Sequence, residues 1–231
     1  MKSRLFAFPC AFFLALSAWS QTFIVDNLKY SVVQTEDFSV RVSLPDSMSS
    51  DRTLMLDSLF IPAFVEYESQ KYKVCEIEPW GFLRCEGVRF VSISEGIRHI
   101  GECAFQDCLH LESVQIPSSI EKIDEGVFSG CVNLSAIVVG KDNPVFDSRE
   151  ACNAVIRSHD NVLVAGCKET RIPSSVTDIG SRAFHRQHFL RLMEIPEGVK
   201  SISYKAFEGC SQLETVSLPE SLREISGDAF K

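Results

Sequence analysis

Motifs that carry catalysis or metal binding are missing from this sequence of 231 residues. It contains no Gly-x-Ser-x-Gly, no Gly-rich phosphate loop and no paired acidic motif. Cys-x-x-Cys is absent too, and the one His-x-x-His, at His185 and His188, falls in a predicted turn without a nearby carboxylate. We therefore expect no catalytic residue, no metal site and no cofactor, and we predict that the protein is not an enzyme.

An excess of basic residues is also missing. The chain has 31 acidic and 23 basic residues, which gives a net charge of −8. The net charge becomes −10 if Lys2 and Arg4 are removed with the first twenty residues. Because a negative surface repels phosphate groups, we expect neither nucleic acid nor anionic lipid to be a partner.

The N-terminus carries the only long apolar run. Lys2 and Arg4 precede the apolar stretch from Leu5 to Leu16, and Ala18-Trp19-Ser20 places small residues where a signal peptidase cuts. This pattern predicts a signal peptide over residues 1–20, cleavage after Ser20 and a secreted or cell-surface protein. The run is shorter than the roughly 20 residues that a membrane-spanning helix needs, so we expect no integral membrane segment.

Most of the remaining chain repeats with a period of 23 residues. The apolar positions of the unit that starts at Ile116-Pro117 recur with identical spacing in the unit that starts at Ile195-Pro196. The regular units are 93–115, 116–138, 172–194 and 195–217, with an earlier unit from Gln70 and an incomplete one over 218–231. The period predicts a solenoid, in which each unit is one coil and equivalent side chains stack in a shared core.

Within a coil, the alternation of residue types predicts one short strand. Leu111, Val114 and Ile116 would point inward, while Ser113 and Gln115 would point outward. The proline that follows this strand in most units lacks an N–H and would end the ladder at the same place in each coil. We expect the strands to form a parallel sheet along one face, and the Ala-Phe pairs to place one aromatic ring per coil in the core.

The repeat Ile-Pro-x-x-Val-x-x-Ile-Gly-x-x-Ala-Phe-x-x-Cys-x-x-Leu-x-x-Val resembles that of the BspA-like leucine-rich-repeat family of bacterial secreted and surface proteins. It is closest over Ile172–Met193 and Ile195–Val216, and the resemblance covers about Gln70 to Lys231. The departures are Gln187 in place of cysteine, Gly81 and Val127 in place of alanine, and Ile93-Ser94 in place of Ile-Pro. The resemblance implies a right-handed, mostly β solenoid, and adhesion or other protein binding for some members.

The two ends of the solenoid differ. Residues 21–69 lack the period, but alternating stretches over 29–33 and 38–42 predict strands, and we interpret this segment as an N-terminal β cap. Ile61-Pro62 would lead into the first coil. The chain stops at Phe230-Lys231 without a polar terminal coil, so we expect either a truncated product or a last coil that something else covers.

The unit over 139–171 is ten residues longer than the others. Ala154–Ile156 and Val162–Val164 are apolar β-formers joined by the polar residues 157–161, which predicts a hairpin. Such an insertion either projects and carries binding or completes the wall of a longer coil. Pairing of Ile156 with Leu163 would place Cys152 opposite Cys167, which makes these two the candidates for a disulfide.

Four other cysteines occupy one position of the repeat: Cys85, Cys108, Cys131 and Cys210. In successive coils their side chains would stack about 4.8 Å apart and point the same way. Parallel side chains oppose the dihedral angle near 90° that a disulfide adopts. We interpret these cysteines as buried thiols that pack like small apolar residues.

The outward strand positions are the candidate partner-binding surface. They are Phe90, Ser92, Ser113, Gln115, Ala136, Val138, Leu192, Glu194, Thr215 and Ser217. Phe90, Val138 and Leu192, which are apolar where short polar residues would suffice, indicate either a contact surface or isolated exposed side chains. The function predicted is a protein-binding or adhesion-type module that meets a protein or glycan at a cell surface or matrix. The alternative is a structural array that self-associates through its C-terminal coil.

Overall fold

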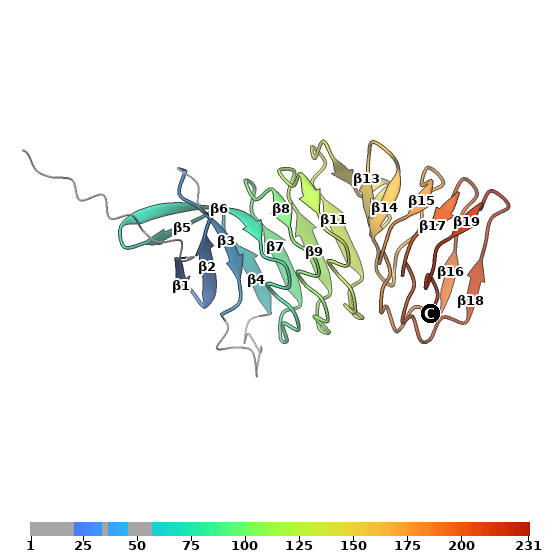
Figure 1. Cartoon of the computed structure of the whole chain (residues 1–231), viewed down its shortest axis with the longest axis horizontal. Helices are drawn as coiled ribbons and strands as arrows, with labels where there is room; N and C mark the ends of the chain where they lie inside the picture. The colour runs from blue at the N-terminus through green and yellow to red at the C-terminus, as the bar shows by residue number, and fades with distance from the viewer. Residues whose placement is uncertain (1–20, 34–36, 46–56) are drawn as a thin grey trace, which may run out of the picture.

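The computed structural model describes residues 21–33, 37–45 and 57–231, so the predicted signal peptide lies outside the described residues. Short strands stack along one long axis, from β1 near one end to β18 and β19 at the other (Figure 1). The only helical element in these ranges is a single short 3-10 turn, η2 (Arg149–Ala151). The predicted mostly β solenoid is confirmed.

The N-terminal part of a mixed sheet precedes the coils. Its strands are β1 (Thr22–Val25), β2 (Leu28–Val32), β3 (Ser39–Ser43), β5 (Phe64–Tyr67) and β6 (Gln70–Ile77). Strands β1 to β3 form a meander, and β3 then pairs with β6 in parallel. Phe23 stacks on Tyr67 with ring centroids 4.4 Å apart. Because Phe23 and Tyr30 belong to the same core cluster as the first coils, this sheet closes that end of the core.

One wall of the solenoid, the front wall, carries the predicted parallel strands and one further strand, β4 (Ser58–Ile61). The predicted strands are β7 (Phe90–Ile93), β9 (Ser113–Ile116), β11 (Ala136–Val139), β16 (Leu192–Glu194) and β18 (Thr215–Ser217). Phe90 pairs with Ser113, and Ser113 with Ala136, so the ladder register repeats the sequence period. Strands β4, β7, β9 and β11 form the first front sheet, and β16 with β18 forms a separate second front sheet.

The opposite wall is built from strands of two residues. They are β8 (His99–Ile100), β10 (Lys122–Ile123), β15 (Asp178–Ile179), β17 (Ser201–Ile202) and β19 (Glu224–Ile225). β8 and β10 extend the sheet of β6 in parallel, whereas β15, β17 and β19 belong to another sheet. Both walls are therefore interrupted in the region of the long unit.

Between the walls, phenylalanine rings stack from coil to coil. The centroid distances are 5.3 Å for Phe82–Phe105, 6.0 Å for Phe105–Phe128, 4.9 Å for Phe184–Phe207 and 5.0 Å for Phe207–Phe230. The predicted aromatic ring in each coil is thus confirmed. The series breaks between Phe128 and Phe184, on the two sides of the long unit. A side chain at Gly166, within that unit, would collide with the ring of Phe184, so the unit packs directly against this stack.

The long unit contains the predicted hairpin. Its strands are β12 (Phe146–Asp147), β13 (Val155–Arg157) and β14 (Val162–Ala165), paired antiparallel with Ile156 opposite Leu163. β14 then pairs in parallel with β15 and so joins the sheet of the opposite wall that contains β15, β17 and β19. Val155 is buried in the core cluster of the N-terminal coils, whereas Ile156 is buried in the cluster of the C-terminal coils. β13 therefore forms a partition between two cores, and the strands do not project.

The last coil leaves apolar side chains exposed. Phe230 stacks on Phe207, yet 41% of its surface is accessible, and Leu218 and Ile225 are also exposed. A hollow of about 410 Å³ lies at this end and is bordered by Phe207, Val216 and Phe230.

Candidate functional site

All ten predicted surface residues lie on the outer side of the front wall. Six belong to the first front sheet and four to the second. The residues between them in sequence, such as Val91, Val114 and Ile137, are buried, so the alternation has the expected phase. The two sheets divide this candidate surface into two parts that do not share a ladder.

The largest aromatic feature of the first front sheet includes a residue that the sequence period did not predict. Phe60 on β4 is 63% exposed and Phe90 on β7 is 38% exposed. Ser58 pairs with Phe90 and Phe60 pairs with Ser92, so the two rings are diagonal neighbours on one face. We call this pair of rings the Phe60/Phe90 patch. Together with polar side chains of β7 and β9 it borders a depression of about 260 Å³.

β4 was missed because it precedes β7 by 32 residues, not 23. A signal was nevertheless present. Leu59 and Ile61 alternate with Ser58 and Phe60, and Ile61-Pro62 matches the strand end of the regular units.

Charged residues frame the patch at the start of the strands. The guanidinium of Arg89 lies 5.1 Å from the Phe90 ring centroid, and its Nε donates to the Glu112 carboxylate at 2.8 Å. This hydrogen bond lowers the pKa of Glu112, to which the positive charge of Lys168 also contributes. Arg89 therefore lies over one face of the Phe90 ring while its side chain remains exposed to solvent.

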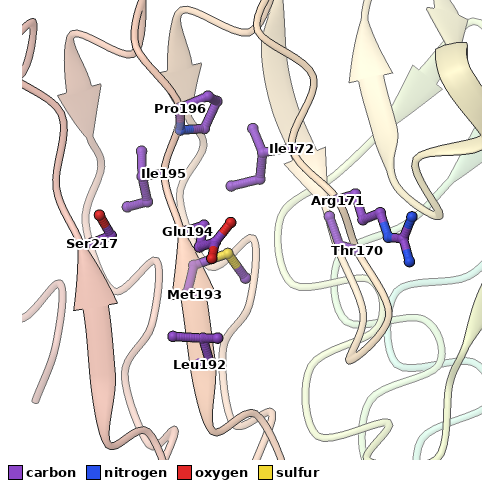
Figure 2. A pocket seen from close by; sticks show the side chains of 9 residues that line it. All are labelled: Thr170, Arg171, Ile172, Leu192, Met193, Glu194, Ile195, Pro196 and Ser217. Carbon is purple, nitrogen blue, oxygen red and sulfur yellow. The ribbon is translucent and has the colours of Figure 1, made fainter.

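A second concave region lies where the front wall is interrupted. A groove of about 600 Å³ separates residues 170–172, where the long unit ends and the next unit begins, from β16, as Figure 2 shows. Leu192 and Glu194 lie along its β16 side, and Ser217 of β18 also borders it.

The cysteines of the repeat position are buried and hydrogen-bonded to the preceding coil. The thiols of Cys108, Cys131 and Cys210 donate to the carbonyl oxygens of Phe82, Phe105 and Phe184, at 3.1, 3.0 and 3.1 Å. Burial raises the pKa of Cys210 to about 12, and it also raises the pKa of Cys108. Such thiols are held neutral and do not act as nucleophiles at neutral pH.

Gln187 takes the place of cysteine in the first coil after the long unit. Its Nε2 donates to the carbonyl oxygen of Phe128 at 3.2 Å. The same acceptor position is thus used, but the longer amide side chain reaches the last regular coil before the partition. Gln187 therefore preserves the hydrogen bond to a phenylalanine carbonyl that cysteine forms in three other coils.

The predicted disulfide between Cys152 and Cys167 is not formed, since both are free thiols. A bulge between Val155 and Ile156 shifts the strands by one residue before they reach the cysteines. The Cys167 thiol donates instead to the carbonyl oxygen of Asn153 at 3.3 Å.

The two histidines of the His-x-x-His motif have different partners. His185 Nε2 lies 3.2 Å from a Glu208 oxygen, and burial lowers the pKa of His185. His188 Nδ1 lies 3.3 Å from the Ser211 hydroxyl. In the part of the chain that the structure describes, no group of three or more His, Cys, Asp or Glu side chains could hold a metal ion. Over the same residues, no helix is long and apolar enough to cross a bilayer.

The stacked coils match a known repeat family. The model of the BspA type leucine-rich repeat region matches residues 63–153 and 164–231, in 6 copies. The chain belongs to the BspA-type leucine-rich-repeat family. Members are bacterial leucine-rich-repeat proteins of the cell surface or exterior, and leucine-rich repeats generally bind proteins.

Two solved leucine-rich-repeat proteins show how far the similarity extends. A leucine-rich repeat protein from Bacteroides ovatus is 29% identical, with a TM-score of 0.59, and the match covers 88% of this chain and 49% of that one. The chain thus spans about half the length of that relative. The leucine-rich repeat protein of T. pallidum is 23% identical, with a TM-score of 0.51, over 89% of this chain and 86% of that one, and supports the fold. Among curated proteins, none matches the sequence.

Proposed function

We propose that the protein is an exported, non-enzymatic binding module whose front wall docks a partner protein at a bacterial cell surface or in the extracellular space. The observation that carries this proposal is the Phe60/Phe90 patch. The two exposed rings are diagonal neighbours on a parallel sheet, and contact of their apolar surface with water is unfavourable in free energy. Aromatic side chains contribute much of the binding energy of protein interfaces. The sheet fixes the backbone of both phenylalanines, so little backbone entropy is lost when a partner binds.

The neighbouring polar side chains favour a mixed apolar and hydrogen-bonding contact. Ser92, Ser113 and Gln115 border the depression beside the rings. This arrangement gives an apolar centre with a polar rim, which is the usual composition of a protein interface. A surface glycan could use the same groups, and the experiment below separates the two partner classes.

Replacing both rings, in Phe60→Ser/Phe90→Ser, should weaken partner capture about tenfold or more, since interface aromatic residues commonly contribute over 1.4 kcal/mol. The measurement is capture of surface and matrix components by the immobilised protein lacking residues 1–20. A purified captured component is then titrated against both proteins. Protease treatment of that component should abolish binding, whereas glycosidase treatment should not.

Ile24→Ser is the matched control, because Ile24 is 57% exposed on β1 in the cap, away from the front wall. It should bind like the wild type. Equal binding by the ring variant and the wild type would contradict the proposal. Loss of binding with glycosidase alone would replace the protein partner with a glycan.

The second candidate function is a self-associating structural array. The exposed Phe230, Ile225 and Leu218 of the last coil favour it. In sedimentation velocity, an array should show a mass that rises with concentration, and Phe230→Ser/Ile225→Ser should return it to a monomer. A wild-type protein that stays monomeric at the highest concentration reached would argue against this candidate.

A further inference from the structure

One strand is missing from the front wall. Thr170 stands 23 residues before Met193 and would occupy the middle of that strand. Its segment makes other contacts, because the Arg171 N–H donates to the Cys152 carbonyl at 3.0 Å and the Thr170 hydroxyl to the Asn153 carbonyl at 2.8 Å. As a result, β11 and β16 border an interruption between the two front sheets (Figure 1).

The edge of β16 that faces this interruption carries unpaired backbone groups. Toward β18, Arg191 accepts from the Thr215 N–H at 3.3 Å, and Ile195 donates to the Ser217 carbonyl at 3.0 Å. Odd-numbered residues of β16 therefore face β18. Because backbone direction alternates along a strand, the N–H and C=O groups of Leu192 and Glu194 face the groove. Among the described residues, none forms a hydrogen bond to them across the groove.

The opposite edge, on β11, is partly covered by the chain itself. The Val139 N–H donates to the Ser148 hydroxyl at 3.1 Å. The groove of about 600 Å³ lies along the β16 edge and includes no residue of β11 (Figure 2).

We propose that the β16 edge binds an extended segment of a partner protein, which adds as a parallel strand and bridges the interruption of the front wall. The inference rests on the proposed protein-binding function and names a second contact for it. One residue of the bound segment would donate to the Leu192 carbonyl and accept from the Glu194 N–H, as Val91 does with Ser113 and Gln115 in the intact ladder. Unpaired strand edges are templates for this mode of recognition.

The chemistry of the groove specifies the side chains of that segment. Ile172 and Ile195 border the groove toward the core, so the central inward residue should be apolar. Glu194 is exposed on the outer face, so the outward neighbour should be polar or basic. Residues 111–116 of this chain have the apolar and polar alternation, and their strand β9 pairs in parallel on both edges. A fluorescent peptide that copies residues 111–116, blocked at both ends, is therefore the probe.

Glu194→Pro tests the edge without breaking the β16–β18 ladder. Proline has no N–H, and the Glu194 N–H points away from β18. By fluorescence anisotropy, the peptide should bind Glu194→Pro about tenfold more weakly than the wild type, because the carbonyl of the central valine of the peptide loses its donor. Glu194→Ala keeps the N–H and is the control, with affinity within about threefold of the wild type.

A second measurement avoids any change to the protein. N-methylation of the central valine of the peptide removes the donor to the Leu192 carbonyl and should abolish binding. N-methylation of its glutamine, whose amide would face away from β16, should not. Absence of wild-type binding at millimolar peptide, or equal binding of both methylated peptides, would overturn the proposal.

The proposed binding role of the Phe60/Phe90 patch is tested independently of the β16 edge. Phe60→Ser/Phe90→Ser should still bind the peptide like the wild type, because the patch lies on the other front sheet. If Glu194→Pro leaves capture of the full partner unchanged while the ring variant loses it, the edge proposal is wrong and the proposed function stands.

Discussion

Replacing Phe105 with alanine should lower the free energy of unfolding by about 3–5 kcal/mol. The ring is 1% exposed and stacks on both neighbours, Phe82 and Phe128. Its removal would leave a cavity between coils that the rigid backbone turns cannot close, so both the buried surface and the ring contacts are lost. Urea unfolding followed by circular dichroism measures the change.

Phe230→Ala is the matched control for this prediction. Phe230 occupies the same repeat position but is 41% exposed and stacks on Phe207 alone. Its truncation should cost about 1 kcal/mol, because little surface is newly exposed and no enclosed cavity forms. Losses of equal size in the two variants would mean that the ring stack does not act as a shared core.

Ile156→Ala should cost about 2–5 kcal/mol and should also separate the unfolding of the two halves. Ile156 is fully buried in the C-terminal core cluster, on the partition strand that joins this cluster to the N-terminal one. In a solenoid, each unit is stabilised through its neighbours, so weakening one boundary uncouples the units on its two sides. The C-terminal coils should then unfold first.

Two optical signals distinguish the halves. Trp80 is the only tryptophan after residue 20 and lies in the N-terminal coils, whereas circular dichroism reports on all coils. In Ile156→Ala, the first transition should appear in circular dichroism and be absent from Trp80 fluorescence. Val155→Ala changes the opposite face of β13 and should move the Trp80 transition. A single shared transition that both variants shift equally would contradict a partition between two cores.

The regular coils could be predicted from the sequence because each apolar position is repeated under the same packing constraint. The phase of the outward residues followed from alternation. The hairpin pairing of Ile156 with Leu163 followed from two apolar runs joined by a polar turn. Phe60 was not predicted, because its strand precedes the next by an irregular spacing. A repeat period identifies only strands that recur at its own spacing, and the spacing between β4 and β7 differs from it.

The partition was harder to foresee than the hairpin that forms it. The run Ala154-Val155-Ile156 is apolar without alternation, which is typical of a strand buried on both faces, but this feature does not say which cores the faces meet. The disulfide was predicted wrongly because a one-residue bulge leaves no mark in the residue types. The open β16 edge depends on where residues 170–172 find hydrogen bonds, and those partners lie outside the repeat.

The thiol-to-carbonyl bonds of the cysteine position join each coil only to the coil before it. A gene duplication or deletion of one whole unit therefore replaces one such link with an identical one, and the reach of the molecule can change over evolution by single coils. Such a change is not tolerated at the partition, because the Gln187 side chain spans the long unit to reach the carbonyl oxygen of Phe128. Changes in length are expected to accumulate within either block, while the junction is inherited as a single piece.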